Sequence, residues 1–284
     1  MLFSEKNLNI WLQFKSFIRF VFKIKPNLKK TVEVNNYRLV FSDFFIGDKL
    51  DEKKWLIGQP WGDFHPDYLH QYYGKDSDFV NVENGSLNLS ARYKPKKFYD
   101  FKKNISITIP YGVGLVFSKD TFKYGYYEIN GILPKGKLLW PAIWLTAEKT
   151  WPPEIDILEA YSGKRSDYSN QLGIPYVKLV PNIHYGFIED NTKSSYGAKV
   201  YPIPLSPSER PVNYSVHWTE KFIKFYYDGY LIFQTEKKEI LDYFNREEVR
   251  MNIILNNAYH PSIDGTKYEA STFKVNYVKF FSKN

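Results

Sequence analysis

The feature that most constrains the fold is a series of short strand-like runs that fills the chain from Val32 onward. The runs alternate apolar and polar residues, which is typical of strands with one buried face. Glycine-containing turn signals separate them at residues 47–48, 84–85, 112, 134–136, 228–229 and 264–265. This spacing predicts an all-β sandwich. No repeat or low-complexity linker divides the body, and one short helix is expected at residues 238–245.

One of these runs carries Glu154, Asp156 and Glu159 within six residues, and the other three residues are apolar. Burying an unpaired carboxylate is costly, so three of them in one strand require a reason. Because side chains alternate between faces, Glu154 and Asp156 point the same way and Glu159 points the other way. One extra residue, at Ile157 or Leu158, would form a β-bulge and return Glu159 to the same face. Bulges are common beside active sites because they re-aim a side chain.

Two glutamates on one face are the groups that hydrolysis of a glycosidic bond requires. In a retaining enzyme one attacks the anomeric carbon and the other protonates the leaving oxygen, with the carboxyls about 5–5.5 Å apart. Asp156 between them can hydrogen-bond a neighbour and help to keep the two pKa values apart. The alternative is a solvated strand face that happens to be acidic. The tryptophans that flank the strand favour a sugar-binding cleft instead.

The acidic strand, with Trp-Pro-Ala-Ile-Trp at residues 140–144 before it, resembles the signature of glycoside hydrolase family 16. Its six-residue, bulged spacing is similar to the laminarinase and agarase branches. The resemblance continues in order from about Asn35 to Phe281, through residues 41–45, 80–89, 122–128, 216–229 and 251–256. It implies a two-sheet antiparallel jelly roll, which is a concanavalin-like fold. It also implies an endo-acting retaining β-glycan hydrolase, with Glu154 as nucleophile and Glu159 as acid/base.

Several alternatives stay open at this point. The first choice of substrate is a β-1,3- or mixed-linkage glucan, and an algal β-galactan of the agar, porphyran or carrageenan type follows. A transglycosylase would use the same carboxylates. A carbohydrate-binding jelly-roll protein is the non-enzymatic alternative, although a pure binding module needs no acidic triad.

Aromatic side chains near the motif are the candidates for substrate binding. Trp140 and Trp144 are four residues apart and therefore share one face of a strand. Trp61 lies in a predicted loop, where it either presents its ring to a sugar or docks on the core. His184 resembles the histidine that in the family lies near the acid/base; otherwise it is a partly buried histidine held by a backbone group. Residues 163–181 form a predicted long loop that could set substrate choice.

These residues require no cofactor and predict no metal site. His65 and His70 lack the spacing and the third ligand of a metal centre. The family often carries Asp where this chain has Asn276, and that position can help to bind a structural calcium ion. Asn is a weaker, neutral ligand, which argues against calcium here. The chain has no cysteine, so disulfides and thiolate ligands are excluded.

Most of the net charge of +8 lies at the N-terminus. Residues 1–30 hold seven basic residues and one acidic residue, a net charge of +6, which leaves +2 for residues 31–284. We therefore expect a basic amphipathic segment at 1–30 and the catalytic domain at 31–284. No nucleic-acid partner is expected, because no known binding motif accompanies the charge. The expected partner is a polysaccharide substrate, and the chain is expected to act as a monomer.

Residues 8–25 combine broken apolar runs with basic residues at every fourth position, Lys15, Arg19 and Lys23. On a helix these three form one basic stripe. The apolar runs are too broken for a membrane span, and no ordinary cleavable signal peptide is evident. Such a helix can lie in a membrane interface. The alternatives are a helix packed on the outside of the sandwich and a degenerate export signal. An extracellular or cell-surface location is expected.

Overall fold

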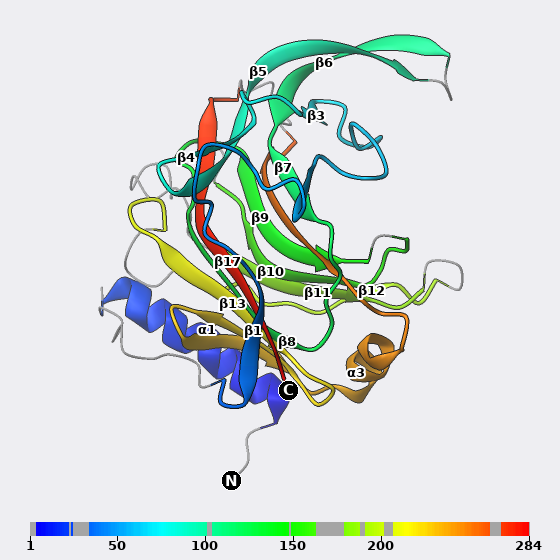
Figure 1. Ribbon diagram of the computed structural model, residues 1–284. Coiled ribbons are helices and arrows are strands. Elements are labelled where there is room, and N and C mark those ends of the chain that lie inside the picture. Colours follow the sequence, from blue (N-terminus) through cyan, green and yellow to red (C-terminus); the bar gives the residue numbers. More distant parts are fainter. Residues whose placement is uncertain are drawn as a thin grey trace.

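The chain folds into two β-sheets that pack face to face, with one long helix at the side (Figure 1). The computed structural model describes residues 4–22, 24, 34–100, 104–147, 149–162, 179–187, 191–201, 207–261 and 268–283. The predicted β-sandwich is confirmed, and so is the helix in the N-terminal segment. Among the described helices, none is long and apolar enough to cross a membrane.

The larger sheet has ten strands: β1 (Tyr37–Asp43), β3 (Gln71–Tyr73), β4 (Val80–Glu83), β5 (Ser86–Asp100), β6 (Ile105–Val113), β8 (Gly125–Ile132), β13 (Val212–Trp218), β14 (Ile223–Tyr227), β15 (Tyr230–Thr235) and β17 (Ser271–Lys283). Their order is β15-β14-β13-β8-β17-β5-β6-β3, with β1 beside β17 and β4 beside β5. Within the described part of this sheet, all pairings are antiparallel except that of β3 with β6.

The smaller sheet has seven strands: β2 (Trp55–Ile57), β7 (Leu115–Ser118), β9 (Leu139–Thr146), β10 (Glu154–Ala160), β11 (Leu179–Tyr185), β12 (Ser194–Ser195) and β16 (Asn252–Tyr259). Their order is β12-β11-β10-β9-β16-β7-β2, so β10 and β9 lie in the interior of the sheet. The helices are α1 (Glu5–Val21) and α3 (Lys238–Asn245), and α3 has the predicted bounds.

Two of the predicted turns close hairpins of the larger sheet. Asn84 and Gly85 join β4 to β5, and Asp228 and Gly229 join β14 to β15. All four residues have positive φ, between 47° and 75°. Positive φ at both central residues is the type I′ geometry that suits a two-residue hairpin, and Asn, Asp and Gly are the residues that adopt it most readily. The local sequence therefore sets the register of these hairpins.

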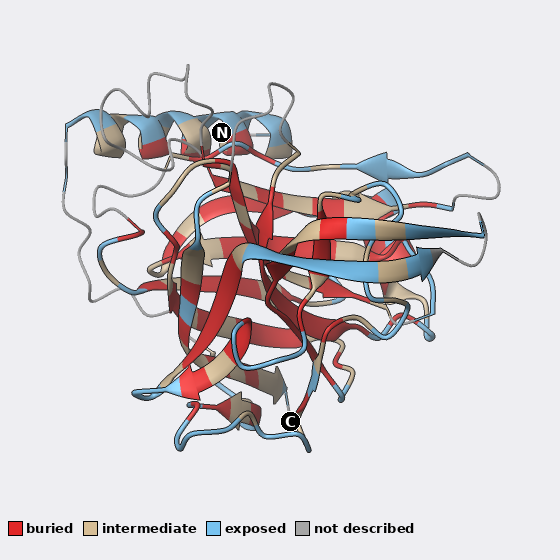
Figure 2. Ribbon diagram, turned by 90° about the horizontal axis from the view of Figure 1, so that it is seen from above, coloured by how far each residue is buried: buried red, intermediate tan, exposed pale blue. Residues whose placement is uncertain are grey.

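The hydrophobic core lies between the two sheets, where the inward-facing side chains of both form one cluster. Ile155 of β10 and Val216 of β13 are members with no exposed surface. Figure 2 shows this buried material running through both sheets, while the loops and hairpin tips are exposed. Since β10 places one face on this core, its other face is free to carry polar groups.

The helix α1 packs against β15, the edge strand of the larger sheet, through polar side chains. Asn9 is buried; its Nδ2 donates to the carbonyl of Gln234 at 2.8 Å, and its Oδ1 accepts from the Gln234 amide at 3.1 Å. The Glu5 carboxylate accepts from the Thr235 hydroxyl at 3.1 Å and from the Glu236 amide at 2.6 Å. An edge strand leaves backbone groups unpaired, and these side chains satisfy them.

Candidate active site

The strand β10 carries the three carboxylates, and its ladder is interrupted where the sequence predicted. Its pairing with both β9 and β11 shifts register between Asp156 and Glu159. This is a β-bulge, and it confirms the prediction. Ile155, Ile157 and Leu158 are fully buried, whereas Asp156 and Glu159 both line the cleft on the other face. The extra residue therefore changes the direction of Glu159 without exposing the apolar side chains of the strand.

A tyrosine from the opposite sheet supports the bulge. The hydroxyl of Tyr227, on β14, donates to the carbonyl of Ile157 at 3.2 Å, and Tyr227 is buried. A bulge disrupts the ladder locally, and a buried carbonyl without a partner is costly. This hydrogen bond satisfies the carbonyl and ties the catalytic strand to the second sheet.

The carboxylates line a cleft with a volume of about 730 Å³. Three of the tryptophans predicted to bind substrate, Trp61, Trp140 and Trp144, line the same cleft. Large concave sites with apolar walls and a few polar groups are typical of ligand binding. The indole of Trp144 donates to Asn256 Oδ1 at 2.8 Å, which orients its ring. Trp61 is 49% exposed, and its ring meets Phe117 edge-on at the wall of the cleft.

Glu159 accepts two hydrogen bonds on one oxygen, Oε1. The donors are the Tyr161 hydroxyl at 2.7 Å and the Trp140 indole at 3.0 Å. Burial raises the pKa of Glu159 above its usual range. The two hydrogen bonds and the nearby His184 stabilise the ionised form and partly offset that rise. A buried carboxyl with a raised pKa is suited to hold a proton near neutral pH.

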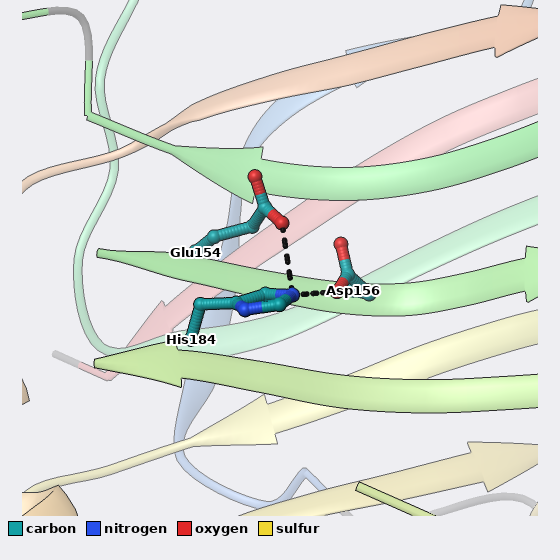
Figure 3. Close-up of side chains that lie close together, drawn as sticks. All are labelled: Glu154, Asp156 and His184. Carbon is teal, nitrogen blue, oxygen red and sulfur yellow. Dashed lines mark ion pairs between the residues drawn. The ribbon is translucent and has the colours of Figure 1, made fainter. Parts of the chain in front are cut away.

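Glu154 lies beside Asp156 and His184 (Figure 3). The Trp151 indole donates to its Oε2 at 3.0 Å, and His184 Nε2 lies 3.4 Å from its Oε1. Burial raises the pKa of Glu154 most, and the neighbouring Asp156 raises it further. The same His184 nitrogen lies 3.5 Å from Asp156 Oδ2. The prediction placed His184 near the acid/base; in the structure it lies against Glu154 and Asp156 instead.

Asp156 is the most deeply buried of the three carboxyls, with 3% of its surface exposed. Its carboxyl hydrogen-bonds that of Glu154, and within the described residues its Oδ2 has no hydrogen-bond partner. Two ionised carboxylates cannot hydrogen-bond each other, so one of the pair holds a proton. Burial raises the pKa of Asp156, as does the charge of Glu159, whereas the hydrogen bond with Glu154 lowers it. The two carboxyls therefore titrate as a pair that shares one proton.

Glu154, Asp156 and His184 offer ligand atoms within 4.8 Å of one another, which is close enough to hold a metal ion. Their own contacts account for this proximity, since the two carboxyls share a hydrogen bond and His184 lies beside both. At the position considered for calcium, Asn276 Oδ1 accepts from the Ser86 hydroxyl at 2.9 Å and its Nδ2 donates to Asn130 at 2.7 Å. The Asn276 side chain is therefore already engaged by protein groups.

Trp151 and Tyr161 contact the carboxyls but were not among the predicted site residues. Tyr161 follows Glu159 by two residues, so strand alternation alone places both on one face. Trp151 precedes the strand, and no spacing rule predicts its contact with Glu154. Of the predicted long loop at 163–181, residues 163–178 lie outside the described residues.

Tyr161→Phe is expected to move the basic limb of the kcat/KM–pH profile upward by about 0.5 to 1 pH unit. The substitution removes a donor that stabilises ionised Glu159, so the pKa of Glu159 rises and its proton is kept to higher pH. The profile is measured on the substrate that the protein turns over fastest. Tyr185→Phe is the control, because the Tyr185 hydroxyl contacts Glu239 instead. A downward or absent shift would contradict this account of Glu159.

The chain is similar to known proteins over most of its length. Residues 75–279 match the family described as Glycosyl hydrolases family 16. The chain is 28% identical over 218 residues to glucan endo-1,3-beta-glucosidase A1 of Niallia circulans, covering 71% of this chain and 30% of that protein. It is 26% identical over 236 residues to endo-1,3-1,4-beta-glycanase EglC of Rhizobium meliloti, covering 82% and 43%. The chain thus spans less than half the length of these two relatives.

Solved structures share the fold. The structure of LamAcat from Zobellia galactanivorans superimposes with a TM-score of 0.67 at 23% identity, covering 86% of this chain and 97% of that one. This likeness extends the sequence match to the arrangement of the two sheets. Because the family match covers most of the chain, including the bulged acidic strand, the chain belongs to glycosyl hydrolase family 16.

Proposed function

We propose that the chain is an endo-acting, retaining hydrolase of a β-1,3- or mixed-linkage glucan. The observation that carries the proposal is the pair Glu154 and Glu159, brought to one cleft face by a bulge in β10. The relatives named for endo-1,3- and endo-1,3-1,4-activity support the class of substrate. Trp61, Trp140 and Trp144 supply the apolar walls along which sugar rings would stack.

In the first step Glu154 attacks the anomeric carbon while Glu159 protonates the leaving oxygen. For this step we place the proton that the two carboxyls share on Asp156, which leaves Glu154 ionised beside the Trp151 indole. On Glu159 both protein donors reach Oε1, so we place the transferable proton on Oε2. The bond from the anomeric carbon to the leaving oxygen breaks as the bond to Glu154 forms.

In the second step water replaces Glu154 at the anomeric carbon. Once Glu154 is an ester it carries no negative charge. The pKa of Glu159 therefore falls, which favours its ionised form. Glu159, which has already given up its proton, now accepts one from the attacking water. Two displacements at the same carbon restore the β configuration, and Glu154 returns to its ionised state beside Asp156.

The test is a reducing-sugar assay of the protein on laminarin, lichenan, agarose, porphyran and κ-carrageenan, beside the Glu154→Gln variant. We expect activity on laminarin or lichenan that the variant lacks. Activity on a galactan alone would replace the glucan with an algal substrate. Transfer to added acceptor sugars in preference to water would indicate a transglycosylase. Binding without turnover of any glycan would contradict the hydrolase.

The catalytic unit is expected at residues 31–284, acting as a monomer.

A further inference from the structure

The helix α1 turns its apolar side to solvent. The residues that it buries are Asn9, Leu12 and Ser16, of which two are polar. Large apolar side chains form an outer face with between 48% and 67% of their surface exposed: Ile10, Trp11, Phe14, Val21 and, directly after the helix, Phe22. Figure 2 shows this pattern, with the buried parts of the helix toward the body and the exposed parts away from it. A surface helix normally has the opposite arrangement.

Polar contacts fix this orientation. Asn9 bonds both backbone groups of Gln234, and Ser16 Oγ accepts from the Tyr201 amide at 3.3 Å. Arg19 lies 4.3 Å from the centre of the Tyr230 ring, so this member of the predicted basic stripe faces the body, while Lys23 lies outside the described residues. Rotating the helix to bury the outer face would break all of these contacts. The apolar face is therefore held outward by the fold.

Basic residues flank the outer face. Lys6 is exposed one turn before Ile10, and Lys15 lies over the ring of Trp11, with 4.4 Å between Nζ and the ring centre. Residues 1–30 carry a net charge of +6. An apolar helix face with a basic margin is the pattern of helices that lie in the headgroup region of a membrane. A second copy of this chain would instead bring two such positive segments together.

We propose that the outer face of α1 binds the surface of an anionic lipid bilayer, with the helix axis in the plane of the interface. None of the residues that line the cleft belongs to α1, so a membrane-bound molecule keeps its cleft open to a glycan. The helix packs on the edge of the larger sheet, whereas the carboxylates lie on the smaller one (Figure 1). This inference does not depend on the identity of the substrate.

The test is co-sedimentation of the full chain with vesicles of phosphatidylcholine and phosphatidylserine, at low salt and at 0.5 M NaCl (about a twofold shorter Debye length than at physiological salt). We expect binding at low salt that weakens at high salt. Ile10→Ser with Phe14→Ser is expected to lower the partition coefficient at least about tenfold, because two large side chains no longer enter the interface. The matched control is Leu39→Ser with Ile46→Ser, which removes two apolar side chains that are 48% and 85% exposed elsewhere.

The proposal is overturned if the full chain does not sediment with these vesicles, or if the two double variants lose binding equally. A second pair of results would also overturn it: the chain stays in solution when vesicles are added, and size-exclusion chromatography shows a dimer. In that case the dimer dissociates in the Ile10→Ser/Phe14→Ser variant but not in the Leu39→Ser/Ile46→Ser variant. That result would assign the outer face to a second copy. Both variants are expected to keep the melting temperature and glycan hydrolysis of the unmodified chain, which separates a failure to bind lipid from a failure to fold.

Discussion

Glu154→Gln and Glu159→Gln are each expected to lower kcat on the preferred glucan by about 10²- to 10⁴-fold. Gln keeps the size of Glu but cannot attack the anomeric carbon at position 154 or transfer a proton at position 159. Both side chains lie on the cleft face of β10. The measurement is initial rate against substrate concentration. Glu83→Gln, at an exposed strand end outside the cleft, is the control.

The two variants are expected to differ on an aryl β-glycoside whose leaving group needs no protonation. Glu159→Gln still has its nucleophile, so it is expected to release the aryl group in the first step. Glu154→Gln has no nucleophile and is expected to stay inactive on both substrates. Identical behaviour of the two variants on the aryl glycoside would contradict the assignment of separate roles.

Asp156→Asn is expected to lower kcat/KM by about 10- to 100-fold. In our account the Asp156 proton is donated to ionised Glu154, and a hydrogen bond to a charged group is stronger than one between neutral groups. The amide of Asn can also donate a hydrogen bond to Glu154. Unlike a carboxyl, however, it cannot release or take up a proton when Glu154 becomes neutral and later ionises again. Steady-state kinetics across pH measure the effect. An unchanged kcat/KM would show that the Asp156 proton has no role.

The same substitution is expected to raise the free energy of unfolding at pH 7 by about 1 to 3 kcal/mol, because Asn has no ionisable carboxyl whose pKa burial must raise. Since burial raises the pKa of folded Asp156, the native state binds more protons than the unfolded chain above the ordinary value of 3.8. Stability of the unmodified protein therefore falls as pH rises from 3.8 toward the raised pKa. Asp156→Asn is expected to make this slope shallower, which urea unfolding between pH 4 and pH 8 would measure.

Much of the site could be predicted because it depends on strand periodicity. Alternation places Glu154 and Asp156 on one face, and the five-residue separation of Glu154 from Glu159 requires a bulge. The turn pairs at 84–85 and 228–229 fix their hairpins locally. These features are properties of neighbouring residues, so the sequence specifies them without knowledge of the tertiary structure.

Other features depend on contacts between distant residues. The hydrogen bond from Tyr227 to Ile157 joins opposite sheets, and strand alternation carries no information about it. The sequence pattern also does not predict the orientation of α1, because a helix with one apolar side is expected to bury that side. Here Asn9 pairs with the unpaired backbone of β15, and this tertiary contact determines the orientation of the helix.

The most direct test of the central claim is to trap the glycosyl-enzyme in the Glu159→Gln variant. The variant is incubated with a dinitrophenyl β-glycoside of a laminari-oligosaccharide, digested, and analysed by peptide mass spectrometry. Without a base to activate water, the intermediate is expected to accumulate, adding the mass of the oligosaccharide to the peptide that contains Glu154. A glycosylated residue other than Glu154, or release of a product with inverted configuration and no adduct, would contradict the account.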